Sequence, residues 1–285
     1  MAQLINGKEI AEKLTNDVAQ RVAALSKNGI IPKIALVNAS PDPASKIYIG
    51  RKKKIAETIG IVSDIYKFDA DVSEHEICSL IEKLNADKSV HAILLQSPLS
   101  GNLDFRKLID MVDPSKDVDG LTTVNQGRLF VGESGIVPCT PMGIMRLIKS
   151  VRDKLGGMHA VVLGRSTIVG NPVAQLLMRE NCTITIVHSR SQNIPEICRS
   201  ADILVSAIGK PNYVTKDFVK PGAIVIDVGI NRIINSDGSK KIVGDVSFDE
   251  VFEITCAVTP VPNGVGPMTV ACLMHNTVSI SEKTT

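Results

Sequence analysis

The chain has 285 residues, of which 44% are hydrophobic, and its formal net charge is +2. This length suits one large domain or two ordinary ones with a sizeable core. The small net charge and an aromatic content of 3% argue against nucleic acid and anionic membranes as partners.

Apolar, strand-like runs alternate with helix-like segments in the first half of the chain. We expect strands at residues 34–38, 61–68 and 92–96, and helices at residues 9–26, 45–59 and 73–85. Such alternation is typical of α/β proteins.

The second half continues this alternation with runs rich in Val and Ile, as expected for parallel strands that are covered on both faces. The expected strands are residues 160–164, 182–188, 203–209, 223–230 and 256–261. We place the domain boundary near residues 136–143, after a polar, turn-rich segment. A helix is expected to start at Pro141 with Thr140 as its N-cap, and a last helix is expected at residues 269–281.

The six cysteines lie far apart and form no Cys-x-x-Cys motif. This spacing argues against a zinc ribbon or a redox pair, so we expect no metal site. Unpaired cysteines suit a reducing cytoplasm. The first residues lack the basic flank and apolar stretch of a signal peptide, and no apolar run approaches the roughly 20 residues of a membrane span. We therefore expect a cytoplasmic protein.

The segment KIYIGRKKKIAE, residues 46–57, carries four consecutive basic residues. At about 100° per residue, Lys52 shares the apolar face of a helix with Tyr48, Ile55, Ala56 and Ile59. The other three basic residues are expected to be solvated. An amine on the apolar face would be partly desolvated, which lowers its pKa and frees it for proton transfer. The alternative is an aliphatic stem along the core with its ammonium group in water, and both readings stay open.

Residues 159–181 predict a strand, a glycine turn at Gly164 and a helix that Asn171 can cap, with Pro172 in its first turn. Backbone N–H groups at such a helix start bind phosphate well. The strict dinucleotide fingerprint is not met, because Ser166 and Val169 stand where glycines are expected. Nucleotide binding and a plain strand–helix turn therefore both stay open.

The next strand ends with His188, Ser189 and Arg190, without the acidic residue that holds the ribose 2′-OH in an NAD site. Arg165 lies in the preceding glycine turn. A 2′-phosphate is attracted by arginine and serine and repelled by a carboxylate, so the pattern favours NADP. The alternative is that Arg165 and Arg190 are ordinary surface charges.

A series of motifs runs in order over nearly the whole chain. It comprises YIGRK at 48–52, QSPL at 96–99, KDVDG at 116–120, PCTP at 138–141, GRSTIVGNP at 164–172, VHSR at 187–190, ADILVSAIGKP at 201–211, PGAIVIDVGI at 221–230, GDV at 244–246 and TPVPNGVGPMT at 259–269. Together these motifs resemble the family of bacterial bifunctional methylenetetrahydrofolate dehydrogenase/methenyltetrahydrofolate cyclohydrolase.

The resemblance implies oxidation of 5,10-methylenetetrahydrofolate by NADP+ and hydrolysis of the methenyl product to 10-formyltetrahydrofolate. It implies an α/β fold of two domains, an N-terminal catalytic domain and a Rossmann-like NADP-binding domain, with the active site in the cleft between them. The folate-binding domain would comprise residues 1–140 and 262–285, because the C-terminal helix returns to it, and the NADP-binding domain residues 141–261. A homodimer that forms through the second domain is expected.

The same resemblance assigns roles to individual residues. Lys52 would be the central catalytic residue, chiefly for hydrolysis, with Tyr48 orienting it and stacking near the folate. Gln96 would form a hydrogen bond with Lys52, and Asp119 would accept hydrogen bonds from the pterin ring. The remaining expected contacts are Pro260, Pro262 and Gly264 for the folate, and Gly164, Arg165, Ser166, Ser189, Arg190 and Ile230 for NADP.

The chain departs from the family pattern in three segments. It has QSPLS for QLPLP at 96–100, DGLTTVNQGRL for DGFHPYNVGRL at 119–129, and PVPNG for PVPGG at 260–264. Ser97 and Ser100 would make their wall more polar and less rigid, and Val124 replaces an aromatic residue. Asn263 tolerates a left-handed backbone, so its turn can survive. These changes leave the catalytic set intact and bear on folate affinity.

Two rival interpretations were weighed. Another two-domain NADP dehydrogenase, such as one resembling shikimate dehydrogenase, would explain the second domain but not the four catalytic residues together. A non-catalytic folate- or nucleotide-binding protein is opposed by the intact Lys52, and an activity assay separates it from an enzyme.

Overall fold

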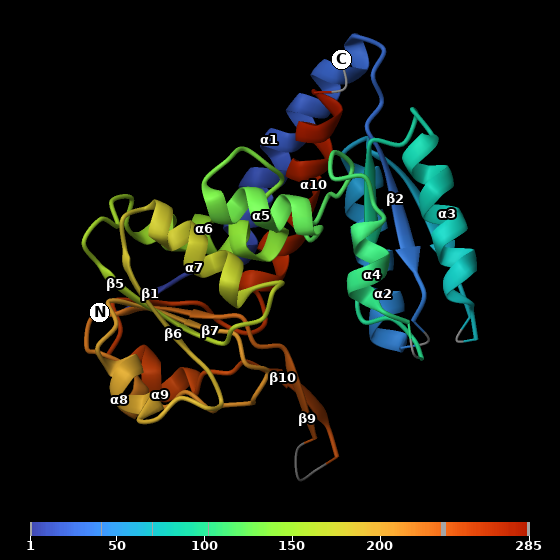
Figure 1. Cartoon of the computed structure of the whole chain (residues 1–285). Helices are drawn as coiled ribbons and strands as arrows, with labels where there is room; N and C mark the ends of the chain where they lie inside the picture. The colour runs from blue at the N-terminus through green and yellow to red at the C-terminus, as the bar shows by residue number, and fades with distance from the viewer. Residues whose placement is uncertain (1, 41, 70, 102, 235–237, 284–285) are drawn as a thin grey trace. The chain divides into compact units, whose positions relative to one another are not determined.

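The computed structural model describes residues 2–40, 42–69, 71–101, 103–234 and 238–283 (Figure 1). The chain divides into two compact units. The six-stranded unit comprises Met1–Ala11 and Thr140–Thr269, and the three-stranded unit comprises Glu12–Cys139 and Val270–Thr285. Each unit is named after its main sheet. The predicted α/β class is confirmed.

The three-stranded unit contains a parallel sheet in the order β3-β2-β4. Its strands are β2 (Lys33–Asn38), β3 (Val62–Lys67) and β4 (Ala92–Leu95), and its helices include α2 (Pro43–Thr58), α3 (Glu74–Ala86), α4 (Phe105–Asp110) and α5 (Thr123–Val131). Helix α3 lies alongside β2 (Figure 1), and Ile77 and Ile81 share a buried apolar core with Ala35 and Val37. Strands β2 and β4 are buried on both faces, which explains their apolar sequences, whereas the edge strand β3 is only partly buried.

The six-stranded unit contains a parallel sheet in the order β1-β11-β8-β7-β5-β6. Its strands are β1 (Gln3–Leu4), β5 (His159–Leu163), β6 (Thr183–Val187), β7 (Ile203–Ser206), β8 (Ile224–Asp227) and β11 (Ala257–Val258). Helices α7 (Gly170–Arg179), α8 (Ile194–Arg199) and α9 (Phe248–Phe252), with the 3-10 turn η1 (Lys216–Phe218), connect them. Because β6 and β7 lie on opposite sides of β5, the strand order reverses there, which is where ligands bind in such sheets.

A separate antiparallel hairpin, β9 (Asn231–Ile234) and β10 (Lys240–Val243), extends from the six-stranded unit (Figure 1). Three long helices cross the sequence boundaries of the units: α1 (Gly7–Lys27), α6 (Cys139–Val151) and α10 (Val265–Ser281). Within the described residues, no helix combines the length and apolar character needed to cross a membrane.

Several expected element ends were wrong. Helix α6 begins at Cys139, so Thr140 lies inside it and does not cap it. Val169 is the N-cap of α7, and Asn171 is already within the helix. Helix α10 begins at Val265, four residues before the expected start at 269. The expected strand 223–230 ends at Asp227, where the chain turns towards β9.

The two compact units also differ from the expected domain ranges at their ends. Residues 1–11 belong to the six-stranded unit because β1 pairs with β11 at the edge of that sheet. A two-residue strand leaves no periodic pattern, so the sequence did not indicate it. The predicted division into a folate-binding part, 1–140 with 262–285, and an NADP-binding part, 141–261, concerns function and stays a prediction.

Candidate active site

Lys52 lies on the buried face of α2, and its side chain is joined to the end of β4. Lys52 is 9% exposed, and its Nζ donates a hydrogen bond to Gln96 Oε1 at 2.8 Å. The Gln96 amide is held from its other side as well, because Nε2 donates to the Ser97 carbonyl at 2.6 Å. Gln96 directly follows β4, at the carboxyl end of a parallel strand. The expected contact between Lys52 and Gln96 is therefore present.

The electrostatic surroundings favour a neutral amine at Lys52 more than bulk water does. Burial lowers the pKa of Lys52, and the negative charge of the Asp119 carboxylate opposes this shift. The hydrogen bond to Gln96 comes from an uncharged amide, which orients the amine without adding a negative charge. A lysine with a lowered pKa can accept a proton near neutral pH.

The predicted apolar stripe on α2 is only partly correct. Lys52 and Ala56 are buried, as expected, and Ile55 and Ile59 are half-buried. Tyr48 is 37% exposed, so it does not lie in the buried stripe. Angular position alone places Tyr48 one turn before Lys52, but it does not indicate how far the covering residues extend. The Tyr48 phenol ring is thus accessible from solvent.

Asp119 lies in a loop that buried polar side chains hold in place. The neighbouring Asp117 is fully buried, and its Oδ2 accepts hydrogen bonds from Thr122 N at 2.8 Å and Asn125 Nδ2 at 2.9 Å. At Gly120 the backbone is left-handed, with φ at +63°, and a Cβ there would crowd the backbone of Ile136 and Val137. This packing explains why the KDVDG segment needs its glycine and its first aspartate.

Two buried residues beside Asp119 were missed by sequence reasoning. Cys139 is fully buried, and burial together with the Asp119 carboxylate raises the pKa of its thiol well above the usual range, so it stays neutral. Asn276 on α10 donates from Nδ2 to the carbonyls of Val118 at 2.9 Å and Val137 at 3.0 Å. Cys139 lies within the PCTP motif, which contributed to the family resemblance, but no role was predicted for this residue. No local pattern indicated Asn276.

The predicted folate loop belongs to the six-stranded unit and follows β11. A Cβ at Gly264 would overlap the Pro260 carbonyl, and one at Gly7 would overlap the Gly264 carbonyl, so the loop is tightly packed. Asn263 adopts a left-handed backbone with φ at +79°, as expected, and its carbonyl accepts a hydrogen bond from Lys8 N at 3.1 Å. The substitution PVPNG is therefore accommodated by the turn.

The other departures from the family pattern have identifiable surroundings. Ser100 is buried, and its N–H donates to the Ala39 carbonyl at 2.7 Å, a bond that a proline could not make. This bond ties the loop after β4 to the end of β2, so the expected loss of rigidity at Ser100 is offset by a new hydrogen bond. Val124 is exposed on α5.

The predicted cofactor residues lie at the carboxyl ends of neighbouring parallel strands. Gly164 to Ser166 follow β5, Ser189 and Arg190 follow β6, and Ile230 lies beyond β8. Arg165, Ser189 and Arg190 are exposed, and Ile230 is 49% exposed. The ends of parallel strands share one edge of a sheet, so these residues form one surface.

The glycine turn after β5 is closely packed although the strict dinucleotide fingerprint is absent. Gly164 has φ at +120°, and a Cβ there would overlap the Ala207 carbonyl. A Cβ at Gly170 would overlap the Gly164 carbonyl, so the helix start packs closely on the turn. Ser166 Oγ accepts hydrogen bonds from the N–H groups of Val169 at 3.2 Å and Gly170 at 3.3 Å. The serine in the fingerprint position thus stabilises the helix start.

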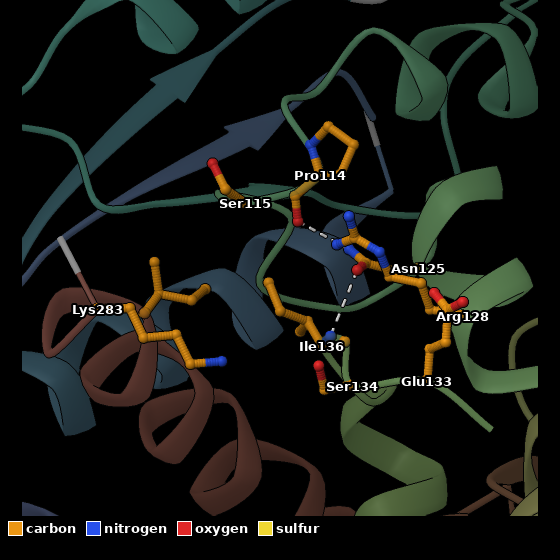
Figure 2. A pocket seen from close by; sticks show the side chains of 10 residues that line it. Pro114, Ser115, Asn125, Arg128, Glu133, Ser134, Ile136 and Lys283 are labelled. Atoms are coloured by element: carbon orange, nitrogen blue, oxygen red, sulfur yellow. Dashed lines mark hydrogen bonds between the residues drawn. The ribbon is translucent and has the colours of Figure 1, made fainter.

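A separate cavity of about 430 Å³ lies in the three-stranded unit. Figure 2 shows that Asn125 forms part of its wall, donating to the Pro114 carbonyl and accepting from Ile136 N–H. The residues that line this cavity include none of the predicted site residues. Across the described part of the chain, no three His, Cys, Asp or Glu side chains are grouped so as to hold a metal ion.

Two family models match most of the chain. The catalytic-domain model of tetrahydrofolate dehydrogenase/cyclohydrolase matches residues 5–119, and its NAD(P)-binding-domain model matches residues 138–285. A curated relative from Zymomonas mobilis, described as bifunctional protein FolD, is 46% identical over 100% of this chain and 98% of its own length.

Solved structures agree with these matches. The bifunctional methylenetetrahydrofolate dehydrogenase/cyclohydrolase from Campylobacter jejuni superposes with a TM-score of 0.96 at 39% identity, covering 99% of both chains. The enzyme from Trypanosoma brucei, solved with NADP cofactor and inhibitor, gives 0.94 at 34% identity, covering 99% of this chain and 98% of its own.

The first rival interpretation, a dehydrogenase resembling shikimate dehydrogenase, is based on a similarity of fold. A shikimate dehydrogenase from Aquifex aeolicus has a TM-score of 0.53 at 13% identity, covering 89% of this chain and 97% of its own, which indicates a shared fold alone. The full-length matches above, in contrast, are specific for one family. The chain belongs to the tetrahydrofolate dehydrogenase/cyclohydrolase family.

Proposed function

We propose that this chain oxidises 5,10-methylenetetrahydrofolate to 5,10-methenyltetrahydrofolate with NADP+ and hydrolyses the product to 10-formyltetrahydrofolate. The observation that carries the proposal is the buried Lys52 amine, oriented by Gln96 at 2.8 Å and close to the Asp119 carboxylate. The proposed enzyme acts in one-carbon folate metabolism.

The hydrolytic step needs a proton acceptor and an oriented substrate. Water adds to the electrophilic methenyl carbon, and the neutral amine of Lys52 accepts a proton from the attacking water. One carbon–nitrogen bond then breaks as the new O–H loses its proton to solvent, which yields the formyl group, and Lys52 returns its proton to the released nitrogen. Gln96 fixes the direction of the amine, and burial lowers the pKa of Lys52, which favours the neutral form.

Asp119, Tyr48 and the loop after β11 are proposed to hold the folate. An ionised carboxylate at Asp119 suits the N–H donors of the pterin ring. The exposed Tyr48 ring offers a stacking surface. Pro260, Pro262 and Gly264 supply the proposed contacts from the six-stranded unit.

The dehydrogenase step uses NADP+, which accepts the hydride when bound. The pyrophosphate is proposed to lie at the turn from Gly164 to Ser166, near the start of α7. Arg165 and Arg190, with Ser189, are proposed to bind the 2′-phosphate, because all three are exposed at the ends of β5 and β6. Ile230 is proposed to contact the cofactor beyond β8.

A cytoplasmic homodimer remains part of the proposal. The exposed apolar side chains of Ile234 and Ile242 on the β9–β10 hairpin support an interface on the six-stranded unit. Sedimentation equilibrium of the purified chain tests this, and a monomer at micromolar concentration would remove it.

One spectrophotometric experiment tests the function. Purified protein is assayed for reduction of NADP+ and NAD+ with 5,10-methylenetetrahydrofolate, and for methenyl hydrolysis in a parallel cuvette. We expect turnover in both assays, NADP+ ahead of NAD+ in kcat/KM, and hydrolysis abolished by Lys52→Ala. Folded protein without turnover would favour the binding-protein alternative, and hydrolysis retained in the Lys52 variant would remove Lys52 from the mechanism.

A further inference from the structure

Two aspartates without an assigned role are buried in the six-stranded unit. Asp227 ends β8 and is 3% exposed, and Asp245 follows β10 and is 0% exposed. Asp245 Oδ2 accepts hydrogen bonds from Ile208 N at 2.8 Å and Gly209 N at 3.2 Å. Its Oδ1 accepts from Lys210 N at 2.9 Å and Asn231 Nδ2 at 2.9 Å. A single carboxylate thus holds three successive backbone amides.

Asp227 in turn holds the segment that carries Asp245. Its Oδ1 accepts hydrogen bonds from Gly229 N at 2.9 Å and Asp245 N at 2.9 Å, and its Oδ2 accepts from Val246 N at 3.0 Å. The donors in these bonds are backbone N–H groups and one side-chain amide, so neutral dipoles stabilise the two negative charges. Such bonds to a buried carboxylate are stronger than bonds between neutral groups.

Two glycines make room for the carboxylates. A Cβ at Gly229 would overlap the carboxylate of Asp245, and a Cβ at Gly244 would overlap that of Asp227. The motifs PGAIVIDVGI and GDV therefore fit together as one unit, in which each aspartate lies against the glycine of the other motif.

The segments fixed by the two aspartates lie at the edge that is proposed to bind NADP. Residues 207–210 follow β7, and residues 228–231 follow β8, on the opposite side of β5 from β6. A dinucleotide that binds at a switch point places one of its halves on each side of that point. Residues 207–210 and 228–231 therefore lie on the side opposite the half that Arg165 and Arg190 are proposed to bind. Ile230 lies between Gly229 and Asn231, both of which the pair binds. The Ala207 carbonyl also packs on the Gly164 turn.

We propose that Asp227 and Asp245 are positioning residues of the dehydrogenase reaction, whose ionised carboxylates hold the loops after β7 and β8 in the form that receives the nicotinamide half of the cofactor. This inference rests on the proposed function. It predicts that the pair affects cofactor binding and leaves the chemistry at Lys52 unchanged.

The inference carries a pH dependence. Burial, opposed by three backbone N–H donors and assisted by the charge of Asp245, raises the pKa of Asp227 to about 6. Protonation of Asp227 replaces a carboxylate acceptor with an O–H group that faces N–H donors. The hydrogen bonds that hold the loops after β7 and β8 therefore weaken as the pH falls through about 6. The charge of Asp245 acts on Asp227, and Lys210, whose backbone N–H binds Asp245, has its ammonium 5.2 Å from the ring centre of Tyr213.

The test measures both activities of Asp245→Asn, Asp227→Asn and Asp249→Asn. Asp249 is an exposed residue of α9 in the same unit and serves as the matched control. Asp245→Asn places an amide N–H against backbone donors, and we expect KM for NADP+ to rise by about tenfold or more. Methenyl hydrolysis should stay within about twofold, because the hydrogen bonds of the two aspartates involve neither Lys52 nor Gln96. The control should change neither activity.

A pH series provides a readout that a purely structural role would not change. For the wild-type chain, KM for the dinucleotide should rise as the pH falls below about 6, whereas Asp227→Asn should flatten this dependence. NAD+ is measured in parallel, because it lacks the 2′-phosphate, which itself titrates in this range. If Asp245→Asn does not fold, Asn231→Ala removes a single donor to Asp245 and should raise KM to a smaller extent.

The inference is overturned if Asp245→Asn leaves KM for NADP+ unchanged. It is also overturned if a folded variant loses both activities in parallel, or if the pH dependence is the same with and without Asp227. A wild-type chain that turns over neither substrate would instead refute the proposed function, so the two failures are distinguishable.

Discussion

Replacing Gln96 with glutamate tests whether the neutral amine of Lys52 is the reactive form. Gln96→Glu keeps the length of the side chain and puts a carboxylate oxygen where Lys52 Nζ now meets an uncharged amide oxygen at 2.8 Å. The new charge stabilises the ammonium form, so the pKa of Lys52 should rise. Lys52 would then be protonated at neutral pH and unable to accept a proton from water.

The geometry sets an upper limit on this effect. At 2.8 Å and an effective dielectric constant of about 20, the attraction between the two charges is about 6 kcal/mol. One pKa unit corresponds to about 1.4 kcal/mol, so the rise is at most about 4 units. Desolvation of the new carboxylate removes part of this gain. Even a rise of half this size, about 2 pKa units, lowers the neutral fraction of Lys52 about a hundredfold.

The assay follows methenyl hydrolysis from about pH 6.5 to 9, with Gln96→Met as the matched control. Methionine has a similar length but neither charge nor a strong acceptor, so it disturbs orientation without raising the pKa of Lys52. We expect about a hundredfold loss for the glutamate variant, with a rate that grows as the pH rises, and a smaller loss for methionine. If the glutamate variant were as fast as the methionine variant, or insensitive to pH, the assignment of Lys52 as proton acceptor would be refuted.

Three further predictions concern other parts of the site. Asp119→Ala should raise KM for the folate about a hundredfold while KM for NADP+ changes little, and equal increases in steady-state assays would indicate a structural role. Arg165→Ala should lower the preference for NADP+ over NAD+ in kcat/KM by about tenfold, and an unchanged preference would place the 2′-phosphate elsewhere. Asn276→Leu should reduce the free energy of unfolding in urea by about 2–5 kcal/mol, because the buried carbonyls of Val118 and Val137 lose their donor. A change below about 0.5 kcal/mol would show that those carbonyls find other donors.

The elements of the fold that the sequence predicted correctly are those that leave a local pattern of apolar residues. Strands such as 160–164 were visible because both of their faces are buried. The burial of Lys52 followed from its angular position on α2, whereas the exposure of Tyr48 depends on which distant residues cover the helix. The expected cap at Thr140 was wrong because a preferred cap residue can equally lie within a first helical turn.

The residues that were missed act over long sequence distances. Asn276 binds carbonyls of Val118 and Val137, 158 and 139 positions away. Asp245 holds Ile208, 37 positions away, through a bond to backbone that no side-chain pattern records. Cys139 has Asp119 as a neighbour only because the fold brings the two residues together.

The order of the two units along the chain has a consequence for synthesis. The three-stranded unit begins at Glu12 but needs residues 270–285 for completion, whereas the six-stranded unit is complete at Thr269. On the ribosome, the first segment of the unit that contains Lys52 is therefore made well before the last helix of that unit. The apolar core that α3 shares with β2 is available early, because all of its residues lie between Ala35 and Leu121, whereas the contacts of Asn276 must wait until the entire six-stranded sheet has emerged.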